Sequence, residues 1–368
     1  MRKDPEPLAT QRLLEVIRGK PVSPYNSAQG QSPPESMQEQ GSGVLEPGEV
    51  LLSSLEPSRS KFRTGIRVGL DIGRSLVKMV RLERTPRSVR LLQVGMACVK
   101  SSSGDSSERV EAAAALLKDL KGSPVVTCLG DADTLVRQIS FPRMPPRQLA
   151  QAMEFEARKH MPYDPGKMLL RHQVLSEDKK NSTFQILLVA VAREALREHQ
   201  ALLKRLGLEP HAIEVAPLAL ANASLLASQQ PQETKVVMDM GTCETLITVH
   251  RNEGMFFSRY IPLSLGPQGR EDQKIEEASL EELLVEIRRS LAYYDNVTGR
   301  MGFSRVMLAG GGAMVPGVGP LLQEKLGLPV EPLNPMPGLH WQQAGSSQHW
   351  VVQSAPLWAL ALGSTLGH

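Results

Sequence analysis

The sequence contains few cysteines and no long hydrophobic run. Its three cysteines, Cys98, Cys128 and Cys243, are scattered along the chain without metal-ligand spacing. An odd number argues against a disulfide framework, so we expect a protein of the reducing cytoplasm. No stretch reaches 18 consecutive apolar residues, and residues 1–20 are charged where a signal peptide requires an apolar core. We therefore expect a soluble protein that reaches a membrane only through a partner.

The sequence also lacks an excess of either charge. It has 42 basic and 39 acidic residues, which gives a net charge of +3. A nucleic-acid-binding domain usually carries a strongly basic face, so nucleic acid is not the expected ligand. The length of 368 residues with 41% hydrophobic content supports a sizeable core, in two domains or in one bilobed domain.

Residues 1–62 differ in composition from the rest of the chain. From residue 21 the segment is rich in Pro, Ser, Gln, Gly and Glu and has few residues that could form a core. We interpret it as a disordered N-terminal extension. Leucine, valine and isoleucine residues between positions 8 and 17 could form one side of a short helix that binds a partner. A frayed terminus is an equally good interpretation of those residues.

From residue 63 onward, patterns of strands and helices alternate, which predicts an α/β fold. Three strands separated by tight turns form a predicted meander near residues 66–99, and a second meander begins near residue 235. Each meander is followed by a helix pattern, at about residues 107–120 and 278–296. The order of elements in the second half therefore repeats the order in the first half.

The two meanders share a short motif. Asp71 and Gly73 in "VGLDIGRSLVKMV" match Asp239 and Gly241 in "VVMDMGTCETLIT", 168 residues later. Glycine allows such a turn to approach a ligand closely, and the backbone N–H groups of the turn can bind an anion. Two facing turns of this kind could bind a phosphate chain from both sides.

Other residues near these turns have side chains suited to phosphate chemistry. Asp71 and Asp239 could hold a hydrated Mg²⁺ at the ends of their strands, and Lys78 could reach a phosphate as a point charge. A third glycine-rich loop, Gly310, Gly311 and Gly312, follows a predicted strand and precedes a predicted helix. One Asp-x-Gly turn is weak evidence, but two in matching context with this loop form a stronger pattern.

These motifs resemble the actin, Hsp70 and sugar-kinase superfamily, whose two RNase H-like lobes close over a nucleotide. More narrowly, "GLDIGRSLVKMVRL", "RQISFPRMPPRQLAQAMEFEARKHMPYD", "EIRRSLAYY" and "LGLPVEPLNPM" resemble the type IV pilus assembly protein PilM family, which is related to FtsA. The resemblance covers about residues 66–368. It implies a first actin-like lobe at 63–228, which includes an extra FtsA/PilM-type subdomain at about 95–190, and a second lobe at 229–368.

The resemblance also implies ligands. ATP and Mg²⁺ are the cofactors that it implies, with Asp71 and Asp239 near the metal, and loss of nucleotide binding is the alternative. Glu214 is the candidate acid that could orient an attacking water. The implied nucleotide-binding residues are Asp71, Gly73, Arg74, Ser75, Lys78, Asp239, Gly241, Thr242, Gly310, Gly311 and Gly312.

The partner implied by the resemblance is the cytoplasmic N-terminal tail of a bitopic inner-membrane protein similar to PilN. The tail would lie between the first lobe and the extra subdomain, and the protein could also self-associate. Phe141, Met144, Met153 and Phe155 form a Met/aromatic cluster of a kind that can receive an extended peptide. An internal core role for these four residues is an equally weighted alternative.

Three departures from the family pattern bear on nucleotide chemistry. The segment between Tyr260 and the "EIRRSL" helix is short, so we expect the upper subdomain of the second lobe to be truncated. Arg74, Cys243 and Glu244 stand where the family favours small or hydroxyl residues, and an inward Glu244 would repel a triphosphate. Ala216 stands where a second acidic residue is expected after Glu214, which disfavours hydrolysis.

Two hypotheses from different classes remain. The first is a cytoplasmic scaffold of a type IV pilus or a related secretion assembly, with ATP as a structural or regulatory ligand. The second is an active ATPase or small-molecule kinase. The fold alone does not decide between them, because the superfamily contains both. The missing acid and the short second lobe favour the scaffold.

Overall fold

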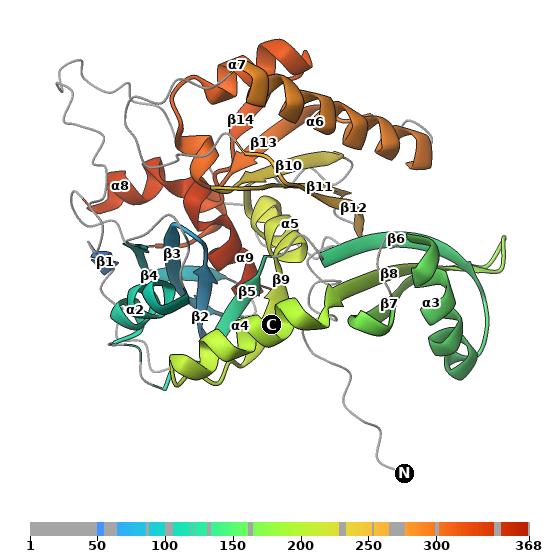
Figure 1. Ribbon diagram of the computed structural model, residues 1–368, viewed down its shortest axis with the longest axis horizontal. Coiled ribbons are helices and arrows are strands. Elements are labelled where there is room, and N and C mark those ends of the chain that lie inside the picture. The colour runs from blue at the N-terminus through green and yellow to red at the C-terminus, as the bar shows by residue number, and fades with distance from the viewer. Residues whose placement is uncertain are drawn as a thin grey trace.

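The computed structural model contains two β-sheets with helices around and between them (Figure 1). The structure describes the following residues: 50–54, 65–85, 88–99, 106–118, 120, 122–130, 134–160, 165–227, 233–251, 254–264, 277–298, 302–341 and 347–366. The helix that we predicted near residue 8 lies outside them.

The first sheet contains the first predicted meander. Strands β2, β3 and β4 are antiparallel neighbours, and β5 and β9 extend the sheet in parallel from β2. Helices α2 (Ser106–Leu117) and α4 (Arg193–Arg205) lie beside this sheet in the first lobe (Figure 1). The strands in sheet order are β1 (Val50–Ser54), β4 (Val89–Cys98), β3 (Leu76–Arg84), β2 (Gly65–Ile72), β5 (Val125–Leu129) and β9 (Ala212–Val215).

The second sheet combines strands from two distant parts of the sequence. The second meander and two parallel strands supply five of its strands, and a three-stranded antiparallel unit from residues 134–192 continues the same sheet. The strands in order are β14 (Val330–Pro332), β13 (Arg305–Ala309), β10 (Lys235–Met240), β11 (Thr245–Arg251), β12 (Gly254–Ile261), β6 (Thr134–Pro142), β8 (Thr183–Ala192) and β7 (Met168–Asp178).

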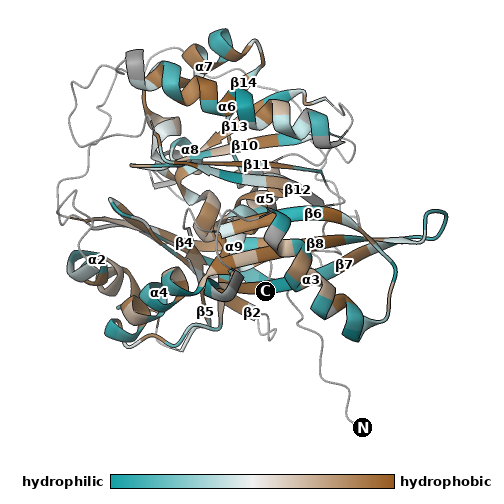
Figure 2. Ribbon diagram, turned by 45° about the vertical axis from the view of Figure 1, so that its right-hand side comes forward, coloured by the Kyte–Doolittle hydropathy of each residue, from teal (hydrophilic) through white to brown (hydrophobic). Residues whose placement is uncertain are grey.

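Helix α6 (Glu277–Thr298) shows how the sequence pattern determines packing. Its buried residues recur every three or four positions, so they form one face against the second sheet: Leu280, Leu283, Leu284, Ile287, Leu291 and Tyr294. Figure 2 shows both hydrophobic and hydrophilic residues along this helix. The remaining helices are α3 (Pro146–His160), α5 (Ala216–Ala227), α7 (Val318–Leu326), α8 (Ser347–Gln353), α9 (Ala359–Leu366), and the short η1 (Pro165–Lys167), η2 (Gly311–Met314), η3 (Met336–Gly338) and η4 (Ala355–Trp358).

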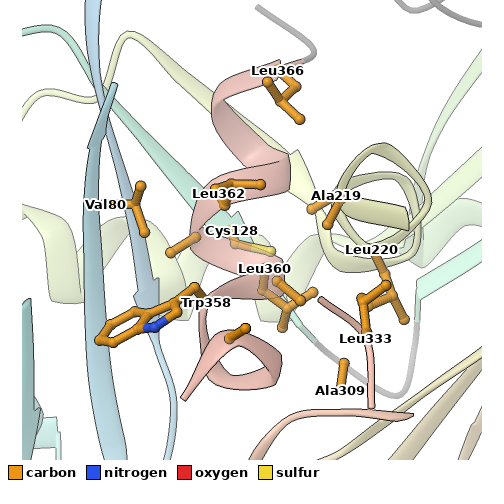
Figure 3. Close-up of a cluster of buried hydrophobic side chains, with 14 of the residues drawn as sticks. Val80, Cys128, Ala219, Leu220, Ala309, Leu333, Trp358, Leu360, Leu362 and Leu366 are labelled. Atoms are coloured by element: carbon orange, nitrogen blue, oxygen red, sulfur yellow. The ribbon is translucent and has the colours of Figure 1, made fainter. Parts of the chain in front are cut away.

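Helix α9 lies in the core between the two sheets. Figure 3 shows it with Val80 of β3 on one side and Ala219 of α5 on the other. Two glycines permit this close packing. A Cβ atom on Gly69 of β2 would overlap the carbonyl oxygen of Ala361, and one on Gly363 would overlap the carbonyl oxygen of Ala219. The C-terminal helix therefore joins the lobes through backbone contacts that no larger residue allows.

The structure confirms the α/β fold and the two matching meanders, and it changes two boundaries. Within the predicted disordered extension, Val50–Ser54 forms β1 and pairs with β4 in an antiparallel register. The residues of the predicted extra subdomain from about 95 to 129 belong instead to the first sheet and α2. The unit that departs from the first sheet is the segment from Thr134 to Ala192, which comprises β6, α3, β7 and β8; we call it the hairpin subdomain.

Candidate functional site

The turn between β2 and β3 is closed by one backbone hydrogen bond. The N–H of Gly73 donates to the carbonyl oxygen of Leu76 at 3.1 Å. A Cβ atom on Gly73 would lie only 2.7 Å from that oxygen, so this position requires glycine. The requirement explains the glycine that interrupts an otherwise apolar stretch.

The turn between β10 and β11 repeats this geometry. The N–H of Gly241 donates to the carbonyl oxygen of Glu244 at 2.9 Å, and a Cβ atom on Gly241 would lie 3.2 Å from the same oxygen. Both bonds close turns of equal length, which confirms at the level of backbone that the two hairpins correspond. We call them the first and second phosphate turns after the chemistry that their sequences predict.

The two phosphate turns touch. The hydroxyl oxygens of Ser75 and Thr242 lie 2.8 Å apart and share a hydrogen bond between the lobes. Ser264 donates a further hydrogen bond from its hydroxyl to the carbonyl oxygen of Gly241 at 2.5 Å. No sequence pattern pointed to Ser264, because its role depends on the return of the chain after β12.

The glycine-rich loop lies against the second phosphate turn. Gly310 has a φ of 76°, which favours glycine, and a Cβ atom there would overlap the Oδ1 atom of Asp239. A Cβ atom on Gly312 would lie 2.5 Å from the Cβ of Met240. Gly311 lies between these two glycines and is the first residue of the short helix η2. The third predicted element therefore reaches the same place as the two turns.

Three charged residues of this site interact electrostatically: Asp71, Lys78 and Asp239. Lys78 and Asp71 are direct neighbours across β2 and β3, and their Nζ and Oδ2 atoms form an ion pair at 2.6 Å. Burial lowers the pKa of Lys78, but attraction to Asp71 and Asp239 outweighs that effect, so the net shift is upward. Lys78 is therefore a cation near both predicted metal-site carboxylates.

Asp239 is the carboxylate most affected by this environment. Burial raises its pKa, Lys78 opposes the shift, and Asp71 and Glu244 add to it, which brings the pKa to about 6. Glu244 is thus close enough to act on Asp239, as expected for a side chain that disfavours a further anion. A bound divalent cation would compensate these carboxylates.

A residue absent from the sequence-based predictions lies beside Asp71. Cys128 of β5 is paired with Asp71 on one side and with Glu214 of β9 on the other. Burial raises the pKa of the Cys128 thiol well above its ordinary value, and Asp71 and Glu214 raise it further. The thiol is therefore neutral. The signal that could have identified it is its position in a buried strand parallel to β2.

The structure also places the remaining candidates. Glu214 lies at the end of β9, where its Oε1 atom accepts the N–H of Val215 at 2.8 Å, and Ala216 begins α5 and is buried. Arg74 is exposed at the first phosphate turn. In the described part of the chain, no group of three His, Cys, Asp or Glu residues could hold a metal ion, so a water-mediated Mg²⁺ at Asp71 and Asp239 stays a prediction.

The predicted partner residues do not share one surface. Met153 of α3 is only 2% exposed, and it packs with Ile139 and Ile186 inside the hairpin subdomain. Phe141 and Met144 are partly buried against the same cluster. Phe155 is different, because it is 67% exposed on α3. In this conformation the core interpretation describes the first three, and only Phe155 presents a large surface.

The duplicated meanders, the helix between the sheets and the facing turns define an actin-like protein. The sequence matches the family model described as type IV pilus assembly protein PilM over residues 69–266 and 270–367. The chain belongs to the PilM family. No helix in the described ranges is long and apolar enough to cross a membrane.

Solved structures are similar to this fold to different degrees. The structure of a "PilM-PilN type IV pilus biogenesis complex" has a TM-score of 0.65 at 24% identity, and the match covers 82% of this chain and 98% of that chain. The ethanolamine utilization protein EutJ from Carboxydothermus hydrogenoformans has a TM-score of 0.44 at 15% identity, covering 86% and 93%. MreB 5 of Spiroplasma citri bound to AMPPNP has a TM-score of 0.42 at 10% identity, covering 83% and 96%. The first similarity supports the fold, and the other two are too weak to carry an argument.

Proposed function

We propose that the protein is a cytoplasmic actin-like scaffold of a type IV pilus assembly or a related secretion assembly, and that it binds the cytoplasmic tail of a PilN-like inner-membrane partner. The observation that carries the proposal is the PilM family match, which extends over both lobes. The similar solved structure is a complex of PilM with PilN. The partner would hold the protein at the membrane, since the described residues contain no membrane-spanning helix.

ATP with Mg²⁺ is the proposed ligand of the two phosphate turns. The support is geometric: the first turn needs glycine and the second leaves little room for a Cβ atom, the hydroxyls of Ser75 and Thr242 meet, and Gly310 contacts Asp239. Backbone N–H groups at such turns can bind phosphate oxygens, while Asp71 and Asp239 would hold water around the metal. Lys78 would balance their charge. We expect a structural or regulatory role, because Ala216 replaces an acid that hydrolysis would use.

Isothermal titration of the full chain with ATP and Mg²⁺ tests the nucleotide part. Wild-type protein should bind, and Asp71→Ala and Asp239→Ala should each weaken binding by at least about tenfold, because each removes a group near the metal. Glu198→Ala is the matched control, since Glu198 is an exposed acid on α4 away from the turns. A wild-type protein that binds no nucleotide would reduce the phosphate turns to a structural feature.

The same samples distinguish a scaffold from an enzyme. Release of inorganic phosphate from ATP should stay near the uncatalysed rate even when ATP is bound. A second titration with a synthetic peptide of the PilN homologue's cytoplasmic N-terminal residues should give saturable binding. Rapid phosphate release that Asp71→Ala abolishes would favour the ATPase alternative instead.

A further inference from the structure

The hairpin subdomain is continuous with the second lobe, although its sequence is inserted in the first. Strand β6 pairs with β12 of the second lobe, with Arg137 opposite Phe257, so one sheet extends from β14 to β7. Figure 1 shows β6 beside the end of the β10–β12 group. We call this β6–β12 contact the seam. Backbone pairing across a seam resists sliding more than apolar contact does, because hydrogen bonds have fixed geometry.

Ser258 of β12 forms hydrogen bonds across the seam to the backbone of β6. Its hydroxyl oxygen accepts the N–H of Val136 at 3.1 Å and lies 3.3 Å from the carbonyl oxygen of the same residue, to which it can donate. Ser258 is 2% exposed, so water does not compete readily for these bonds. One serine thereby satisfies both backbone polar groups of Val136.

Arg137 of β6 makes a second set of side-chain contacts across the seam. Its guanidinium lies over the ring of Phe257 at 5.7 Å and over the ring of Tyr293 at 5.1 Å, and it donates a hydrogen bond to the Tyr293 hydroxyl. The two rings are themselves 5.4 Å apart. An arginine over an aromatic ring is attracted by the negative face of that ring. The arginine from the first half of the chain is thus held by a strand and a helix of the second lobe.

The contact of the hairpin subdomain with the first lobe has a different character. Val136, Leu187 and Leu175 pack there against apolar residues of β5, β9 and α5, including Leu129 and Val215. Apolar contacts have no preferred direction, so they allow small shifts at lower cost than directional hydrogen bonds do. The seam therefore holds β6 against β12 through directional hydrogen bonds, whereas the contact with the first lobe is mainly apolar.

The seam is also connected to the second phosphate turn. Strand β12 leads to two residues that contact that turn. The Thr245 hydroxyl donates a hydrogen bond to the carbonyl oxygen of Leu263 at 2.8 Å. The Ser264 hydroxyl donates one to the carbonyl oxygen of Gly241. A movement of the second turn relative to the first would carry β12 and, through the seam, the hairpin subdomain.

We propose that the hairpin subdomain moves as a rigid extension of the second lobe, and that the seam formed by Ser258, Arg137, Phe257 and Tyr293 transmits lobe closure to the partner-binding region. This inference rests on the proposed function for its biological readout. Closure of the phosphate turns on a ligand changes the spacing between the hairpin subdomain and the first lobe. The affinity for a peptide bound between those two parts then depends on the nucleotide.

Hydrogen exchange of the full-length protein without any ligand tests the mechanical part. Ser258→Ala should raise the exchange of the β6 amides, that of Val136 above all, by about tenfold or more, and should raise β12 exchange with it. Arg137→Met keeps the apolar stem but removes the charge, and should act in the same direction. Arg171→Met is the control, because Arg171 is exposed on β7 and donates to the adjacent Leu170 carbonyl. Unchanged β6 exchange in Ser258→Ala would overturn the proposal.

Peptide titration in the presence and absence of ATP and Mg²⁺ tests the transmission. In the wild type the nucleotide should change the Kd of the PilN-homologue peptide by about fivefold or more. Arg137→Met should bring that ratio close to one while each ligand still binds alone. A wild-type protein that binds both ligands without any change in Kd would overturn the inference, whereas failure to bind either ligand would count against the proposed function, and the exchange result would stand.

Discussion

Asp239 shows how a single buried carboxylate links the site to stability. Its pKa is about 6 in the folded protein, above the ordinary aspartate value of 3.8, mainly because of burial. A folded pKa that is raised means that the folded state favours the protonated form. The contribution of Asp239 to the free energy of unfolding is therefore most favourable below pH 3.8, and it is lost as the pH rises through about 6.

Asp239→Asn should accordingly stabilise the ligand-free protein at neutral pH. The difference in free energy of unfolding between the variant and the wild type should grow from pH 4 to pH 7, to the order of 2–3 kcal/mol for a shift of about two units. Urea denaturation at several pH values measures it. Glu198→Gln, an exposed acid on α4, is the control and should give a difference that stays nearly constant. A difference for Asp239→Asn that shrinks with rising pH would contradict the assignment.

Helix α9 packs very closely against β2 and α5, because at each contact a glycine lets the backbones approach without an intervening side chain. Between β2 and α9 the contact is made at Gly69, and between α9 and α5 it is made at Gly363. Packing of this kind leaves no space for a single methyl group, because the overlapped atoms are backbone carbonyls that cannot rotate away. The position of α9 between the lobes therefore depends on the absence of a Cβ atom at these two positions.

Gly363→Ala should destabilise the protein by about 3 kcal/mol or more, since the helix would have to move off α5. Gly319→Ala offers a matched control in another helix. A Cβ atom on Gly319 would meet no neighbour within 4 Å, but Pro320 follows it and disfavours a helical residue that carries a Cβ atom. The change should therefore shift the free energy of unfolding by no more than about 1 kcal/mol in either direction. Chemical denaturation of both variants provides the comparison. Equal stabilities for the two variants would show that α9 is not packed as described.

At the scale of the whole molecule, the described part of the N-terminal extension is strand β1, which lies against β4 and α2. Strand β1 covers the outer edge of the first sheet by pairing with residues 93–97 of β4. The family match begins at residue 69, beyond this strand. Water can satisfy the exposed edge of β4 if β1 is absent, so the extension should contribute little to global stability.

Deletion of residues 1–60 should therefore lower the melting temperature by no more than about 2–4 °C, which corresponds to about 1 kcal/mol for a protein of this size. Differential scanning calorimetry measures the temperature, and light scattering during gel filtration shows whether the uncovered β4 edge recruits a second molecule. A larger fall in melting temperature would assign β1 a structural role that its short pairing with β4 does not suggest.

Much of the site could be predicted from sequence because its parts are local. The glycines of both turns, the carboxylates before them and the glycine-rich loop each depend on backbone rules that operate over a few residues. Their duplication 168 residues apart indicated a two-lobed fold before any contact was known. The position of Cys128 beside Asp71 escaped prediction because parallel pairing joins residues that are distant in the sequence.

The sequence by itself determined the α/β class, the repeated hairpins and the residues of the phosphate turns, since period-two strands and tight turns are encoded by neighbouring residues. Only the tertiary structure decided that Met153 faces the core of the hairpin subdomain while Phe155 faces outward, and that β6 joins β12. The physical reason is that strand partners and buried faces are selected by long-range packing, in which many pairings are locally possible and the complete core determines which one forms.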